Sequence, residues 1–251
     1  MIAVYVILMA AGLIGMIVCS KKQKTNPAMQ PVAFVLFIVV VVGAIMLLRS
    51  LNVFGGNDSL LSNELKFYAS QGNQAGVFLA KENGGKKVLF IAEPNFDASE
   101  SIKGLIDAFK KGYGSDNVVV DTIALPEGQQ NDPMPLYMIM KAKDFDALLE
   151  KHSDCQVVVT SIGLPEDVNR MNFWKMAADK RPVLFLLGLP SGRINGLADQ
   201  IKKGTVAGVV VPNPSAKYDV PVPRDPAEAF AIRYLLIDKS NVDANINSLN
   251  N

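Results

Sequence analysis

Residues 86–114 read KKVLFIAEPNFDASESIKGLIDAFKKGYG, and this stretch decides the fold. It opens with Val88–Ala92, an uninterrupted apolar run with the length of a buried strand. Asp97 or Ser99 can then cap a helix, and Gly114 can end it. The apolar side chains of this helix recur at helical spacing, at Ile102, Leu105, Ile106 and Phe109. The stretch therefore predicts a buried strand followed by an amphipathic helix.

The same alternation continues along the chain. Further short runs rich in valine, isoleucine and leucine predict strands at Val118–Ile123, Gln156–Thr160, Val183–Gly188 and Val206–Val211. The helices between the strands are expected at Ser99–Lys111, Ala142–Lys151, Val168–Asp179 and Arg193–Lys203. Because nearly every run is apolar on both faces, the strands should be parallel and covered by helices on both sides. We predict an α/β fold with a doubly wound, mainly parallel five-stranded sheet in the order 2-1-3-4-5, with a Rossmann-type order as the alternative.

The carboxyl-terminal part has a different composition. Residues 212–226 hold five prolines and predict an extended strap. Asp225 then caps a helix predicted at Ala227–Ile237, with proline at its first position. The asparagine-rich tail, residues 239–251, is predicted to be disordered, because it offers few side chains that can pack.

The α/β domain, residues 86–238, follows two other segments. Residues 57–85 predict a juxtamembrane helical segment, in which Gly72 can interrupt the helix. Residues 1–56 predict a transmembrane helical hairpin, because residues 1–20 and 25–48 contain no charge and each supplies the roughly 20 apolar residues that cross a bilayer. The whole chain is 49% hydrophobic and 20% charged, which agrees with a part that lies in lipid.

Two other interpretations of residues 1–20 remain open, a cleaved signal peptide and a lipoprotein signal ending at Cys19. A signal peptide requires a basic residue near its start, but none precedes Lys21 here. A lipoprotein signal has small residues just before its cysteine, and here Ile17 and Val18 occupy those positions. We therefore prefer a retained hairpin.

The charges of the hairpin predict its orientation. Lys21, Lys22 and Lys24 lie in the short connection between the two spans, whereas Arg49 follows the second span. The positive-inside tendency places the connection in the cytoplasm and the α/β domain outside it. Residues 50–251 carry 21 basic and 24 acidic residues, a net charge of −3. We therefore expect lipid bilayer as a partner and no nucleic acid.

The segments quoted above, together with NVVVDTI, DFDALLEKHSDCQVVVTSIG, RPVLFLLGLP and GTVAGVVVPNP, carry a family resemblance. Over about residues 86–215 the chain resembles one lobe of a type I periplasmic binding protein, in which Gly104–Phe109, Gln156–Thr160 and Arg181–Phe185 match the hydrophobic pattern of the family. The resemblance implies a non-enzymatic protein that binds a sugar or an amino acid between two lobes. This chain has one lobe, so such binding requires another subunit to supply the opposite wall.

Catalytic and cofactor signatures are absent from the sequence. The single histidine, His152, falls at the end of a predicted helix, where its charge meets the helix carboxyl end. Cys155 begins a predicted strand and is expected to be a buried small residue. No P-loop or dinucleotide fingerprint occurs. We expect no catalytic residue, no cofactor and no metal site.

Polar side chains follow several predicted strands at their carboxyl ends, where open α/β sheets bind ligands. These ligand-binding candidates are Glu93, Asn95, Asp97, Ser99, Ser161, Glu166, Ser191, Arg193 and Asn213. Residues of these types are also ordinary turn and cap formers. The sequence leads to two hypotheses. In the first, a membrane-anchored domain binds a small polar solute or a partner protein outside the cytoplasm. In the second, the chain is an accessory subunit of a membrane complex, or a homo-oligomer, and binds no solute.

Overall fold

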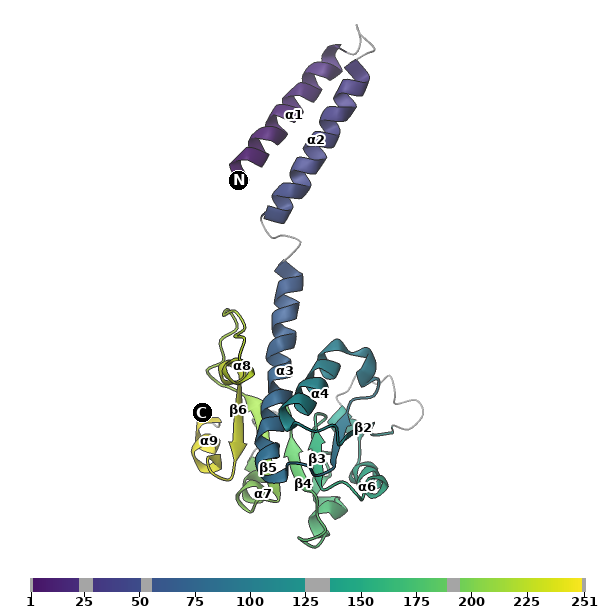
Figure 1. The fold of residues 1–251 in the computed structure, drawn as a ribbon, viewed down its shortest axis with the longest axis vertical. Helices are drawn as coiled ribbons and strands as arrows, with labels where there is room; N and C mark the ends of the chain where they lie inside the picture. Colours follow the sequence, from purple (N-terminus) through teal and green to yellow (C-terminus); the bar gives the residue numbers. More distant parts are fainter. Residues whose placement is uncertain (1, 23–28, 51–55, 125–135, 189–194, 250–251) are drawn as a thin grey trace. The chain divides into compact units, whose positions relative to one another are not determined.

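The computed structural model of the 251-residue chain describes residues 2–22, 29–50, 56–124, 136–188 and 195–249. The chain divides into two compact units, Met1–Ser62 and Asn63–Asn251 (Figure 1). The first unit holds a pair of long helices. The second holds the α/β sheet with its covering helices.

The first unit pairs α1, Ile2–Lys22, with α2, Met29–Ser50. Glycines let the two helices approach closely: a Cβ atom on Gly12 would lie 2.7 Å from Val40, and one on Gly15 would lie 2.9 Å from Leu36. Gly12 and Gly15 therefore serve the contact between α1 and α2.

One described helix, Met29–Leu47, is long and apolar enough to cross a membrane, with a mean hydropathy of 2.6. The sequence predicts two such spans, so this expectation is corrected to one. A single apolar helix near the amino terminus is also typical of a signal sequence.

The second unit contains a six-stranded sheet in the order β2-β1-β3-β4-β5-β6. The strands are β1 Val88–Ala92, β2 Val118–Thr122, β3 Val157–Thr160, β4 Val183–Leu186, β5 Val206–Pro212 and β6 Tyr234–Asp238. The first five are parallel and follow the predicted order 2-1-3-4-5, which excludes the Rossmann-type alternative. The sixth strand was not predicted, and it pairs antiparallel to β5.

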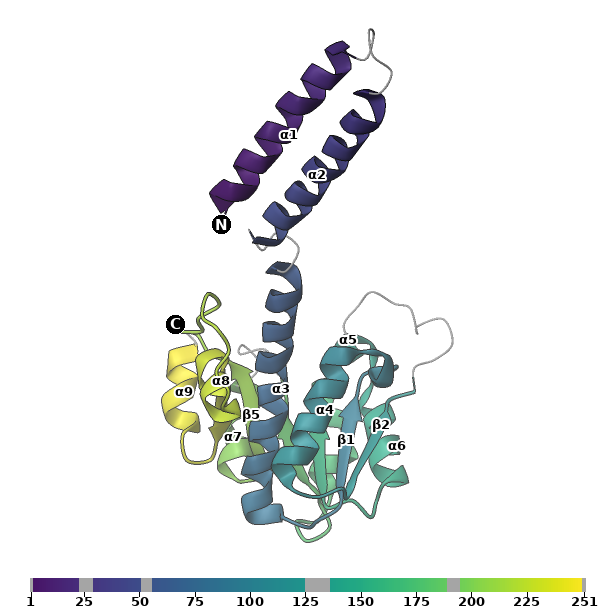
Figure 2. The same cartoon turned by 45° about the horizontal axis from the view of Figure 1, so that its top comes forward.

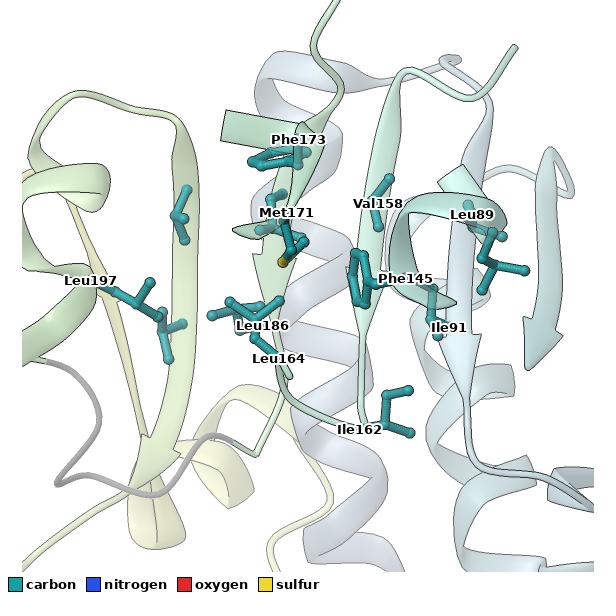
Figure 3. Packing of buried hydrophobic residues seen from close by; sticks show 14 of the residues in the cluster. Leu89, Ile91, Phe145, Val158, Ile162, Leu164, Met171, Phe173, Leu186 and Leu197 are labelled. Carbon is teal, nitrogen blue, oxygen red and sulfur yellow. The ribbon is translucent and has the colours of Figure 1, made fainter. Parts of the chain in front are cut away.

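Helices cover both faces of the sheet. One face packs on α3 Gly56–Asn83, α4 Glu100–Tyr113 and α8 Pro226–Arg233, with α3 and α4 side by side (Figures 1 and 2). The other face packs on α6 Ala142–Lys151, α7 Ala198–Lys202 and α9 Val242–Leu249. Figure 3 shows part of this second layer, in which Phe145, Met171 and Phe173 gather over the strands. Shorter elements are η1 Phe96–Ala98, α5 Leu136–Ile139, η2 Val168–Arg170, η3 Asn172–Lys175 and η5 Asn195–Leu197.

Two predicted helices differ from the structure. The helix expected at Val168–Asp179 is replaced by the short 3-10 helices η2 and η3. Met171 and Phe173 are both fully buried, and side chains two residues apart do not share a face of an α-helix. The helix expected at Arg193–Lys203 is shortened to α7, preceded by η5, and its first two residues lie outside the described ones.

The carboxyl-terminal expectations also change. The helix predicted at Ala227–Ile237 ends at Arg233, because the following residues pair with the open edge of β5 and form β6. Residues 213–225 contain no helix or strand, as the predicted strap requires. The tail predicted to be disordered forms α9, because Val242 is 1% exposed and packs in the core.

Candidate functional site

The carboxyl edge of the parallel sheet is the place where this fold gathers loops. Strands β1 and β3 are neighbours, but the chain leaves β1 toward β2 on one side and returns to β3 on the other. A crevice forms at such a switch point in open α/β sheets. The loops after β1 and β3 flank it. Since α3 ends at Asn83, just before β1 begins, the residues of α3 that precede its last turns run back along the sheet toward this edge.

The loop after β1 places several predicted residues in solvent. Glu93 and Asp97 are exposed, and Asn95 adopts a left-handed conformation with φ of 59°. Ser99 is the N-cap of α4, where its hydroxyl accepts a hydrogen bond from the Ile102 amide at 3.5 Å. The predicted role of Ser99 as a helix cap is therefore confirmed, and its hydroxyl is already used as a hydrogen-bond acceptor.

The loop after β3 meets the end of β1. The amide and the hydroxyl of Ser161 both donate to the carbonyl of Ile91, at 3.0 and 3.2 Å. Glu166 is exposed, and its neighbour Asp167 accepts a hydrogen bond from the Ala142 amide at 2.8 Å, which caps α6. The structure thus brings the loops carrying Glu93 and Ser161 together.

The remaining candidates do not join this group. Asn213 follows β5, three strand spacings or about 14 Å from β1. Its side chain accepts from the Ser215 amide and donates to the Ala231 carbonyl, so it holds the strap. Ser191 and Arg193 lie outside the described residues.

Two tyrosines that the sequence analysis missed as site residues lie at the carboxyl edge. Burial, together with smaller effects of the negative charge of Glu93 and of the nearby Tyr234, raises the pKa of Tyr68 to about 12. Burial also raises the pKa of Tyr234, against a hydrogen bond with Gln71 that lowers it. Tyr68 therefore stays a neutral hydroxyl near physiological pH and lies within electrostatic reach of both Glu93 and Tyr234.

A buried arginine, Arg233, directly precedes Tyr234 in the chain. Arg233 is 3% exposed, and its guanidinium carbon lies 4.2 Å from the ring centroid of Phe67 and 4.1 Å from that of Tyr218. Its Nη2 donates to the Glu64 carboxylate at 2.8 Å, and its Nε has no hydrogen-bond partner in the described structure. Arg233 therefore fastens Tyr218 of the strap to α3.

The sequence contained a partial signal for these residues. Tyr234 falls inside the helix predicted at Ala227–Ile237, which in fact ends at Arg233. The short apolar run that begins at Tyr234 is also typical of a buried strand, and a strand at this position puts Tyr234 at the carboxyl edge.

The carboxyl edge offers neutral hydroxyls and carboxylates. Glu93 accepts hydrogen bonds, and the Tyr68 hydroxyl can donate or accept them. Such groups suit an uncharged polar solute or a peptide backbone. The single histidine, His152, caps the carboxyl end of α6, at the opposite edge of the sheet. No histidine-based nucleophile is therefore available near Glu93.

Comparisons with known proteins add the following. No family model matches the chain, and no curated protein matches its sequence. Its fold is similar to that of a glucose-galactose binding protein from Geobacillus stearothermophilus, at 15% identity and a TM-score of 0.44, over 70% of this chain and 61% of that one. It is also similar to a carbohydrate transporter solute binding protein from Agrobacterium radiobacter in complex with D-arabinose, at 18% identity and a TM-score of 0.45, over 73% of this chain and 63% of that one.

An arabinose binding protein from Geobacillus stearothermophilus is similar at 16% identity and a TM-score of 0.39. The chain spans about three fifths of the length of these proteins. All three are described as proteins that bind a sugar or a carbohydrate solute.

Proposed function

We propose that this chain is a membrane-anchored, non-enzymatic binding domain whose carboxyl edge binds a small polar solute or a segment of a partner protein outside the cytoplasm. The observation that carries the proposal is the position of Glu93 in the loop after β1, at the switch point of the sheet and within electrostatic reach of Tyr68. The exposed carboxylate and the neutral phenol are both able to hydrogen-bond to hydroxyl or amide groups.

The anchor in this proposal is the helix pair of the first unit. The span Met29–Leu47 has its apolar side chains largely exposed, with Phe34 at 64% and Val35 at 58%. An exposed apolar helix of this length is stable in a bilayer and costly in water. The connection bearing Lys21 and Lys22 would lie in the cytoplasm, with the second unit on the other side.

An accessory role without solute binding has its own support. The side chains of Ser99, Ser161 and Asn213 already make hydrogen bonds inside the unit. The cavities found among the described residues lie away from the loop after β1. A partner chain that covers the carboxyl edge would then supply the missing wall of the site.

Ligand-dependent thermal stabilisation of the full-length chain in detergent tests the proposal. A solute at one hundred times its Kd adds about 2.7 kcal/mol to stability. We expect D-arabinose, glucose, galactose or an amino acid from a broad panel to raise the Tm. Glu93→Gln should abolish that rise, while Asp116→Asn, an exposed carboxylate at the opposite edge, should leave it unchanged.

The same experiment separates the two functions. Absence of a shift across the whole panel would reject solute binding by the isolated chain. Co-purification of a stable complex that Glu93→Gln weakens would then favour the partner-protein form of the proposal. A complex that is insensitive to Glu93→Gln but lost when the helix pair is altered would favour the accessory role.

A further inference from the structure

A second group of side chains, all of which can bind metal ions, lies on the turn that joins α6 to β3 at the amino edge of the sheet. One atom each from His152, Asp154 and Cys155 lies within 4.8 Å of the other two, counting a ring nitrogen, a carboxylate oxygen and the thiol sulfur. Cys155 is 5% exposed, and Asp154 is exposed. Nitrogen, oxygen and sulfur donors of this kind are the ligands that zinc uses in proteins.

The backbone explains why these side chains converge. The His152 amide donates to the Leu148 carbonyl at 3.1 Å and ends the helix, and the Cys155 amide donates back to the His152 carbonyl at 2.9 Å. This tight turn places positions 152 and 155 next to each other. The convergence therefore follows from the helix end and needs no long-range adjustment.

A carboxylate outside the turn orients the histidine. The Nε2 of His152 and the Oδ2 of Asp121, which lies in β2, are 2.7 Å apart. The same oxygen of Asp121 also accepts a hydrogen bond from the Nζ of Lys151 at 2.7 Å. A carboxylate that accepts from one ring nitrogen directs the lone pair of the other toward a metal, as in many zinc sites.

A cavity adjoins the turn. It has a volume of about 360 Å³ and is lined by His152, Cys155 and the carboxylates of Asp146 and Glu150, among others. It leaves room for a fourth ligand, such as water. The carboxylates of Asp146 and Glu150 attract a cation to this place, whereas Lys180, which also lines the cavity, repels it.

We propose that His152, Asp154 and Cys155 form a zinc site with a fourth position open to this cavity. Ligand atoms around tetrahedral zinc stand about 3.3 to 3.8 Å apart, so the three atoms close by about 1 Å on binding. The thiol of Cys155 loses its proton to solvent, and the ammonium of Lys87, now paired with Asp154, moves into water. The sequence analysis expected no metal site. Two cysteines are too few for a site made of cysteines alone, but they do not exclude a site with mixed ligands.

Cobalt substitution tests this site in the full-length chain, in detergent and under reducing conditions. We expect Co²⁺ to produce thiolate-to-cobalt absorption in the near ultraviolet together with the visible bands of a tetrahedral ion, and equimolar Zn²⁺ to remove both. Cys155→Ser should abolish the near-ultraviolet band. Cys19→Ser, which changes the other cysteine, should leave the spectrum unchanged.

Two further variants test the remaining ligands without altering the buried cysteine. Asp154→Asn changes an exposed side chain and should weaken Co²⁺ and Zn²⁺ binding at least tenfold. Asp121→Asn should weaken it about 10- to 100-fold, since it removes the group that orients His152. The proposal is overturned if the wild-type chain gives no thiolate band with Co²⁺, or if Cys155→Ser keeps it. Zinc affinity that is equal in the wild type and in Asp154→Asn would remove that residue from the ligand set.

Discussion

Arg233 carries a full positive charge into the protein, and its surroundings must offset the cost of burial. An uncompensated buried ion costs several kcal/mol. The rings of Phe67 and Tyr218 stack on either side of the guanidinium, and the Glu64 carboxylate pairs with it. The strap and α3 are therefore joined through the side chain of Arg233. Removal of one partner of the ion pair should affect stability strongly, because it leaves the other charge without its counter-ion.

Removing the acid should destabilise the chain only while the arginine is present. We expect Glu64→Gln to lower the free energy of unfolding by about 1 kcal/mol or more, because Arg233 then lacks its counter-ion. In an Arg233→Met background the same change should have almost no effect. Urea unfolding of the full-length chain in detergent measures both. Glu82→Gln, which breaks an exposed pair with Lys239 at 3.9 Å, is the control and should change little. Equal losses in both backgrounds would contradict this role.

At the scale of residues, the sequence predicted where the polar candidate residues lie better than it predicted what their side chains do. Ser99 was predicted to cap a helix and does so. Ser161 and Asn213 lie at the carboxyl edge as expected, yet their side chains fix the local backbone. Turns and ligand sites favour the same residue types, so composition does not separate the two uses. Tyr68 reaches Glu93 only because α3 packs across the sheet, which is a tertiary effect.

At the scale of elements, glycines set the contact between α3 and α4. A Cβ atom on Gly72 would lie 2.0 Å from the Leu105 carbonyl oxygen, and one on Gly76 would lie 2.4 Å from that of Phe109. The sequence suggested that Gly72 interrupts the helix, but α3 runs unbroken from Gly56 to Asn83. The absence of a side chain at Gly72 therefore allows the backbones of α3 and α4 to approach closely, and it does not form a turn.

This contact predicts opposite effects for two glycine substitutions. Gly76→Ala should lower the free energy of unfolding by about 2 kcal/mol or more, because its methyl group meets the α4 backbone, which cannot rotate away. Gly104→Ala, inside α4 with no atom within 4 Å, should raise it by about 0.5 to 1 kcal/mol through helix propensity. Denaturant titration of the two variants measures both signs. A neutral Gly76→Ala would show that the helices separate easily.

The elements that the sequence predicted well are those with an unambiguous period. Four of the five parallel strands are mostly buried, β2 being the exception at the edge of the sheet, and each of the five lies within two residues of its predicted bounds. The carboxyl-terminal elements depend on tertiary partners. Tyr234–Asp238 has both helical and strand character, and the open edge of β5 decides for the strand. Likewise α9 forms because Val242 finds a place in the core.

At the scale of the whole molecule, charge is distributed unevenly along the chain. The first 57 residues contain Lys21, Lys22, Lys24 and Arg49 and no acidic residue, whereas the remainder has 21 basic and 24 acidic residues. Positive charge near a membrane span is retained in the cytoplasm. Lys21 and Lys22 end α1 and Lys24 follows them in the sequence, and these three charges outweigh the single Arg49 in the last turn of α2.

This distribution predicts the topology of the chain. In a background with Cys19 and Cys155 changed to alanine, Ser59→Cys should react with a membrane-impermeant maleimide in intact cells, because residues after α2 lie outside the cytoplasm. Gln23→Cys, between the three lysines, is the matched control and should react only after lysis. Both variants should stay in the membrane fraction after alkaline extraction, since the apolar helix pair holds them there. The reverse labelling pattern would place the carboxyl edge in the cytoplasm, and release by alkali would mean that the helices do not anchor the chain.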